Sequence, residues 1–319
     1  MYLGGLTFLF IDMIIDTYKK QLSILRHLGY TESDEYVCPF CLRSFTDVSL
    51  ISLEDAPQEA LGGSKIALTC KECNNKLGGL VDCHLVNYIV DKEDRLFPKE
   101  MVRSFTFHDK KRGRDIQGKI EVNKTGEIRM IFPEKVNDPK VLNAAVKEIK
   151  KGDIIGAEMR VNLSKRMPRN IVAALLKNAY ILLFSYFGYS FLLNSFYDCF
   201  RDQINAPEKE IVPEGLISVE GAFNALKDGI YVCDDMPLRG FFVVFTLKKR
   251  EGHKYGVFIP AIINGLEPAI EAARLIEKGD MVVVSEVEKS PFFWENQERI
   301  ERLILWSTNE KMKWTDVVS

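Results

Sequence analysis

The chain has 319 residues, which is long enough to bury a sizeable core and to form two or three domains. Hydrophobic residues make up 46% of it and charged residues 28%, as in ordinary soluble globular proteins. The formal net charge of -2 excludes a protein that is basic all over. A local basic groove is still compatible with it, because binding depends on the field of a patch and not on the sum.

The first predicted element is a helix over residues 6–29 that ends at Gly29, because apolar residues recur there at intervals of three and four. Its apolar start, residues 3–15, is short and carries Asp12. It lacks both a basic leading segment and a small-residue cleavage site, so we interpret it as helix and not as a signal peptide. Residues 1–35 are therefore expected to form an N-terminal helical segment.

Residues 36–97 are predicted to form a compact metal-binding module with two C-x-x-C pairs. Two residues between paired cysteines let both sulfurs face one ion, so Cys38, Cys41, Cys70 and Cys73 are predicted to bind a structural Zn2+. A redox function of one pair is the alternative, but it leaves the other pair without a role. The remaining three cysteines are scattered, unlike a disulfide framework, which favours reduced thiols and a cytoplasmic location.

Between the cysteine pairs, "SLISL" and "IALTC" are predicted strands joined by a turn at a glycine pair. Glu54 and Asp55 end the first strand, and Asn74 follows the second cysteine pair. A helix over residues 81–97 is expected to close the module. Carboxylate and amide oxygens suit Mg2+ or Mn2+, so these three residues are candidates for a second metal site.

The span from Cys38 to His84 resembles the zinc-containing branch of the HNH (ββα-metal) endonucleases. That branch shows C-x-x-C, an Asp/Glu-His-x-x-Pro-like step with Leu-Gly-Gly, then C-x-x-C-Asn and often Asp-x-His-Leu. This chain has "CPFC", "LEDAPQEALGG", "CKECN" and "VDCHL" in the same order. The resemblance implies a ββα-metal module with structural zinc and a nuclease that hydrolyses phosphodiester bonds of nucleic acid with Mg2+ or Mn2+.

Carried over by position, the resemblance implies that Glu54 and Asn74 bind the catalytic divalent ion. It places Asp55 where the family has its general-base histidine. An unperturbed Asp has a pKa near 3.9 and a His near 6.5, so Asp55 would be a poor base at neutral pH and a good metal ligand. His84 is the one histidine of the module, and it is either a base or ligand or an ordinary surface or core histidine.

Three interpretations of Asp55 stay open. The residue is a ligand of a metal that activates water, or it marks a degenerate nuclease that still binds nucleic acid, or it is an inactivating substitution. The alternative to an endonuclease is therefore a zinc-containing module that binds nucleic acid or protein without catalysis. One example would be an effector that is active only together with a protein partner in a bacterial defence complex.

From residue 98 the sequence predicts a larger α+β domain for substrate or partner binding, with a secondary boundary near residue 205. Its uncharged run over residues 179–197 is long enough for a bilayer span. Asn194, several serines and tyrosines, and Gly188 favour a buried helical hairpin instead, so no membrane contact is expected. The other predicted elements are antiparallel strands within 102–132, a helix over 139–152, a strand over 154–163, and strands over 215–219, 229–233, 240–248, 254–262 and 280–287.

Two basic segments are candidates for contact with nucleic acid, most naturally DNA. They comprise Lys110, Lys111, Arg112 and Arg114 in a predicted hairpin loop, and Lys165, Arg166 and Arg169 before a predicted helix. Phosphate contacts of this kind would hold a duplex without reading its sequence. The alternative is that both segments are ordinary solvated loops.

Overall fold

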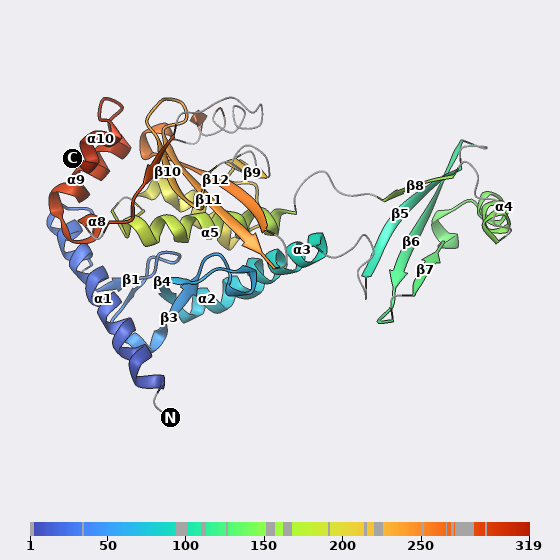
Figure 1. The fold of residues 1–319 in the computed structure, drawn as a ribbon, viewed down its shortest axis with the longest axis horizontal. Helices are drawn as coiled ribbons and strands as arrows, with labels where there is room; N and C mark the ends of the chain where they lie inside the picture. The colour runs from blue at the N-terminus through green and yellow to red at the C-terminus, as the bar shows by residue number, and fades with distance from the viewer. Residues whose placement is uncertain are drawn as a thin grey trace. The chain divides into compact units, whose positions relative to one another are not determined.

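The computed structural model describes residues 3–33, 35–93, 101–109, 113–125, 127–150, 157–161, 168–190, 192–213, 216–219, 226–249, 252–265, 267–268, 271, 284–290 and 292–319. The chain divides into two compact units (Figure 1). The larger unit joins Met1–Ile89 to Pro168–Ser319, and the smaller unit is Val90–Met167. This grouping differs from the expected single domain over residues 98–319, because the elements after residue 168 pack with the cysteine module.

The chain begins with helix α1 (Leu3–His27), in agreement with the predicted helix. Ile15, Tyr18, Leu22 and Leu25 recur at helical spacing, and all four are buried. The helix ends before Gly29, whose left-handed φ of 78° suits a residue without a side chain. One face of α1 therefore contributes to the core of the larger unit.

The cysteine module follows as two short antiparallel pairs and a helix. Strands β1 (Tyr36–Val37) and β2 (Ser44–Phe45) pair around the first C-x-x-C turn. Strands β3 (Ile51–Asp55) and β4 (Lys65–Cys70) form a second pair, with a register shift between Glu54 and Asp55. Helices α2 (Lys71–Leu77) and α3 (Cys83–Glu93) come next, joined by a π-helical turn over Gly78–Asp82. The two predicted strands are thus confirmed, and the closing helix is confirmed over Cys83–Glu93; residues 94–97 of that prediction lie outside the described residues.

A glycine pair shapes the connection between β3 and β4. Gly62 has a left-handed φ of 85°. A Cβ atom on Gly63 would lie 1.7 Å from the carbonyl oxygen of Pro57, so a larger residue cannot fit there without moving the backbone. Local steric constraints therefore explain why glycines follow Leu61 in this turn.

Helix α5 (Arg169–Phe187) is the central element of the larger unit, and a short helix α6 (Asp198–Asn205) packs beside it. Helix α5 is long and apolar enough to cross a membrane, but 83% of its most apolar window is buried inside the fold. It contacts β4 on one side and a β-sheet on another. A helix that is apolar all round is expected to be surrounded by protein in this way.

The sheet beside α5 has five antiparallel strands in the order β13-β10-β11-β12-β9. The strands are β9 (Ile217–Val219), β10 (Gly229–Cys233), β11 (Gly240–Lys248), β12 (Gly252–Pro260) and β13 (Ser285–Val287). All five were expected from the sequence. Within β11 and β12 nearly every residue is buried, which agrees with a sheet covered on both faces.

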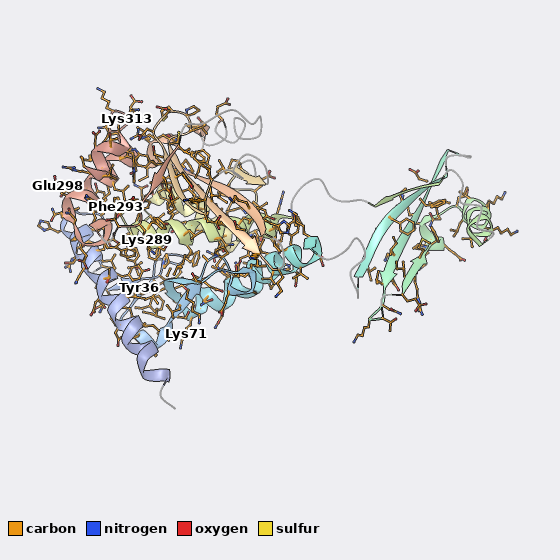
Figure 2. The ribbon with its side chains drawn as sticks, viewed as in Figure 1. Tyr36, Lys71, Lys289, Phe293, Glu298 and Lys313 are labelled. Carbon is orange, nitrogen blue, oxygen red and sulfur yellow. The ribbon has the colours of Figure 1, made fainter. Side chains whose placement is uncertain are left out.

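Three C-terminal helices, which the sequence analysis did not predict, complete the larger unit. They are α8 (Phe292–Glu295), α9 (Gln297–Thr308) and α10 (Trp314–Val318). The buried guanidinium of Arg239 donates to the carbonyl oxygens of Trp306 and Asn309, which satisfies the end of α9. Tyr36 and Phe293 lie inside the unit, whereas Lys71 and Lys313 lie at its surface (Figure 2).

The smaller unit contains an antiparallel sheet in the order β7-β6-β5-β8 and a helix, α4, that packs on it. Its elements are β5 (Met101–Asp109), β6 (Arg114–Val122), β7 (Ile128–Ile131), α4 (Pro139–Lys150) and β8 (Ala157–Val161). Along β6, buried Ile116, Ile120 and Val122 alternate with polar residues, and Val141 and Leu142 of α4 pack near Ile116. Both units therefore combine helices with antiparallel strands, which confirms the α+β class.

Candidate metal centre

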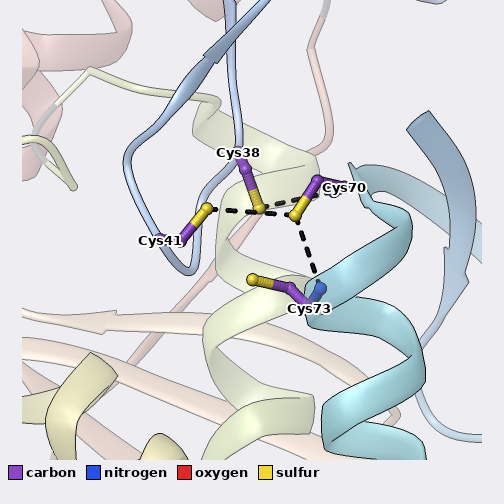
Figure 3. Close-up of side chains that lie close together, drawn as sticks. All are labelled: Cys38, Cys41, Cys70 and Cys73. Carbon is purple, nitrogen blue, oxygen red and sulfur yellow. Dashed lines mark hydrogen bonds between the residues drawn. The ribbon is translucent and has the colours of Figure 1, made fainter. Parts of the chain in front are cut away.

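The four predicted zinc ligands meet at one point of the larger unit (Figure 3). The sulfur atoms of Cys38, Cys41, Cys70 and Cys73 all lie within 4.8 Å of one another, and the Sγ atoms of Cys41 and Cys70 are 3.9 Å apart. Four sulfurs about 2.3 Å from a tetrahedral Zn2+ lie about 3.8 Å apart. The cluster can therefore hold a structural metal ion such as zinc, and its geometry fits that ion.

Two tight turns bring the thiols together. In the first, the amide of Leu42 donates to the carbonyl oxygen of Cys38, and Leu42 has a left-handed φ of 54°. In the second, Cys70 is both the last residue of β4 and the N-cap of α2, so the first turn of the helix carries Cys73 to the same side. Strand, turn and helix thus position four ligands that are far apart in the chain.

Hydrogen-bond donors surround the sulfurs. The amides of Cys70 and Cys73 donate to the Sγ atoms of Cys38 and Cys70, each over 3.4 Å. Arg43 Nε donates to Cys41 Sγ over 3.4 Å. The pKa of the Cys41 thiol lies well below its ordinary value, because the neighbouring thiols of Cys38 and Cys73 and the Arg43 side chain donate to it. Such donors favour the thiolate, which is the form that binds metal.

Tyrosine hydroxyls attach the cluster to the rest of the larger unit. Tyr180 of α5 donates to the carbonyl oxygen of Pro39 over 3.0 Å, between the first two cysteines. Tyr189 donates to the carbonyl oxygen of Val37 just before them. Tyr36 donates to Leu68 O of β4 over 2.5 Å. These tyrosines are buried and bonded, so they belong to the core and do not form an exposed base-stacking surface.

Glu54, one of the predicted ligands of a catalytic ion, points into the protein and faces a lysine. Its side chain is 1% exposed, and Oε1 lies 2.5 Å from the Nζ atom of Lys177 in α5. Its other oxygen accepts from the hydroxyl of Thr69 over 3.1 Å. Lys177 also donates to Asp82 Oδ2 over 2.5 Å. One buried ammonium therefore joins two carboxylates of the module.

The side-chain amides of Gln58 and Asn178 extend the hydrogen bonding around the ion pairs of Lys177 with Glu54 and Asp82. Gln58 Nε2 donates to Asp82 Oδ1 over 2.6 Å and to Asn178 Oδ1 over 3.2 Å. The sequence analysis met Asp82 only as part of the "VDCHL" motif, and it gave no role to Lys177, Gln58 or Asn178. The available signal was a lysine followed by an asparagine within the apolar run "ALLKNAY", because a buried charge needs a partner.

Burial and attraction act in opposite directions on these charges. Burial raises the pKa of Glu54 and of Asp82, and the ammonium of Lys177 offsets this only in part. Burial also acts to lower the pKa of Lys177, but the attraction of Glu54 and Asp82 outweighs it, and the pKa is raised. The lysine is therefore protonated, because two carboxylates share its single positive charge.

The other predicted site residues lie on the same module in different settings. The half-buried Asp55 accepts a hydrogen bond from the amide of Glu59, and its charge contributes to the raised pKa of Asp82. Asn74 Nδ2 donates to Ser52 Oγ over 3.0 Å and to Leu53 O over 3.1 Å, so it fastens α2 to β3.

His84 lies exposed on α3. Across the part of the chain that the structure describes, the four cysteines are the one group of three or more His, Cys, Asp or Glu side chains close enough to hold a metal.

Most of the predicted nucleic-acid contacts lie outside the described residues. These are Lys110, Lys111, Arg112, Lys165 and Arg166, together with the side chain of Arg114. Arg169 is described and exposed, and its Nη2 atom lies 3.0 Å from Glu210 Oε2. Arg169 therefore already has an acidic neighbour at the start of α5. No protein-family model, curated protein or solved structure matches the chain.

Proposed function

We propose that residues 36–93 form an HNH-type ββα module around a structural zinc ion, and that this module binds nucleic acid without cleaving it. The supporting observation is the order of the elements: the first cysteine pair precedes β3, β3 pairs with β4, the second cysteine pair joins β4 to α2, and α2 is bonded back to β3 through Asn74. This is the order that the resemblance to HNH endonucleases implies.

The contacts of Glu54 favour binding over hydrolysis. Metal-dependent hydrolysis needs a divalent ion that stabilises the developing charge, and it gains from a base that activates water. The acid that would hold the ion is instead paired with Lys177. The position of the base carries Asp55, whose carboxylate accepts a backbone hydrogen bond. Both contacts therefore support a module that binds nucleic acid without cleaving it.

A second candidate, a metal-dependent endonuclease, is favoured by the neighbouring carboxylates of Asp55 and Asp82. Asp55 is half-buried, and the Asp82 side chain is 13% exposed. Two adjacent carboxylates that reach solvent are a reasonable start for a divalent site, with Asp55 as ligand and the metal activating water. The exposed His84 could serve that site only if it came within hydrogen-bond reach of the water.

One experiment separates the two functions. The full chain, loaded with zinc, is mixed with labelled duplex DNA, single-stranded DNA or RNA, and binding is followed by fluorescence anisotropy at several salt concentrations. The same mixtures with plasmid, and with Mg2+ or Mn2+, are checked for cleavage with and without chelator. We expect salt-dependent binding and no cleavage products. Absence of binding at low salt contradicts the proposal, and chelator-sensitive cleavage establishes the endonuclease.

A further inference from the structure

We infer that Lys177 is the built-in cation of the module: its ammonium lies between Glu54 and Asp82, where a divalent ion would otherwise bind. The inference deepens the proposed function, because it names the residue that keeps a divalent ion out of the module. It rests on the proposed function only for the role of Glu54. It predicts that removal of the ammonium converts a closed ion pair into a cation site.

The distances support this placement. Lys177 Nζ lies 2.5 Å from Glu54 Oε1 and 2.5 Å from Asp82 Oδ2. Oxygen ligands surround Ca2+ at about 2.3–2.6 Å and Mg2+ at about 2.0–2.1 Å. A divalent ion at the position of Nζ would therefore meet both carboxylates with small shifts of their side chains.

The surrounding groups are oxygen-rich and already oriented. Glu54 is fixed by the hydroxyl of Thr69, and Asp82 by the side-chain amide of Gln58. Asp55 adds negative charge close to Asp82. Without the ammonium, the two buried carboxylates would have to take up protons or a cation, since an isolated buried charge is costly.

The lysine comes from a distant part of the chain. Lys177 belongs to α5, whereas Glu54 lies near the end of β3 and Asp82 lies in the turn before α3. Helix α5 contacts both β4 and this turn. The C-terminal part of the larger unit thus supplies the cation of the N-terminal module, and the charge of the module depends on α5 being in place.

The test uses the full chain with zinc bound and Mn2+ as the probe, followed by electron paramagnetic resonance of the free ion and by titration calorimetry. The wild type should have no Mn2+ site that is lost when Glu54 is changed to Gln. Lys177→Met, whose unbranched side chain is one atom shorter and carries no charge, should gain about one Mn2+ per chain. Adding Glu54→Gln to this variant should abolish the gain. Lys76→Met, on the exposed lysine that contacts Asn205, is the matched control and should behave as wild type.

Thermal unfolding keeps the inference testable if Lys177→Met folds poorly. An ion that binds only the folded state raises its melting temperature, so Mn2+ should stabilise Lys177→Met and leave the wild type unchanged. A folded variant that takes up no Mn2+, a poorly folded one that Mn2+ does not stabilise, or a wild type with a Glu54-dependent Mn2+ site would each overturn the inference. Nucleic acid is absent throughout, so failure of the binding proposal leaves these outcomes unchanged.

Discussion

Lys177 Nζ and Glu54 Oε1 lie 2.5 Å apart, and both side chains are 1% exposed. The pair connects the central helix of the larger unit to the end of a strand in the cysteine module. A buried ion pair is weak evidence for added stability, because removal of two charges from water offsets their attraction. Loss of one partner is different, since the remaining charge is left buried without compensation.

Lys177→Met should therefore destabilise the protein by about 3–5 kcal/mol, measured by urea unfolding of the zinc-loaded chain without divalent ions. The double variant Lys177→Met/Glu54→Gln should recover part of this loss, because it leaves one buried carboxylate fewer unpaired. Glu54→Gln alone completes the cycle: an equal effect of this change with and without Lys177 would mean that Glu54 and Lys177 are not energetically coupled.

The zinc prediction has a control within the same chain. Cys70→Ser removes a buried ligand that also caps α2, so the protein should lose its zinc and the module should unfold. Cys83→Ser changes an exposed thiol outside the cluster and should keep both. Metal analysis after dialysis, with circular dichroism, gives the answer. Less than about half an equivalent of zinc in freshly purified, unchelated wild type would contradict a resident ion.

Glu54 also makes stability depend on pH. Its pKa in the folded protein is raised, mainly by burial, so the folded state holds this proton more tightly than the unfolded state. The resulting stability is full below the unfolded pKa of about 4.3 and is lost as the pH rises through the folded pKa. Between these values the wild type should lose stability relative to Glu54→Gln. Zinc ligands also titrate in acid, but equally in both proteins, so the difference between them isolates Glu54. If the free energy of unfolding of the wild type and of Glu54→Gln changed with pH by the same amount, the pKa of Glu54 would not be raised.

Local spacing in the sequence was sufficient for the cysteine cluster, because two C-x-x-C turns each need only a few neighbouring residues. The strands of the five-stranded and the four-stranded sheet were also predictable from alternating or continuous apolar runs. The partner of Glu54 was not, since Lys177 is brought to it by tertiary packing of α5 and leaves no periodic signal near residue 54. The same reason explains the grouping of residues 168–319 with the cysteine module.

The first basic segment, Lys110, Lys111 and Arg112, should matter for affinity. Changing Lys110, Lys111 and Arg112 to Ala should weaken DNA binding and flatten the dependence of log K on log salt, by about 0.9 for each phosphate that the protein no longer neutralises. Lys119→Ala, on an exposed strand position of the same unit, is the control and should keep the wild-type slope. An unchanged slope in the triple variant would show that these three residues do not neutralise DNA phosphates and belong to the ordinary solvated surface.

Asp55 decides between the two proposed functions, and three variants test it with plasmid and Mn2+. If the module only binds, the wild type shows no cleavage. Asp55→His then stays inactive as well, because a restored base still lacks an ion at Glu54. If Asp55 is a ligand of a working site, the wild type cleaves, and Asp55→Ala loses both cleavage and Mn2+ affinity.

Asp55→Ala also removes the hydrogen bond from the amide of Glu59, so a fall in activity could reflect a loosened turn. Asp55→Asn keeps an acceptor oxygen for that amide and removes the charge, which makes it the matched control. A base contributes typically about 10²- to 10⁴-fold, so renewed cleavage by Asp55→His alone would be visible against a weak background. Such a gain would show that the Glu54–Lys177 pair does not block the divalent ion, and the proposal of binding without cleavage would have to be abandoned.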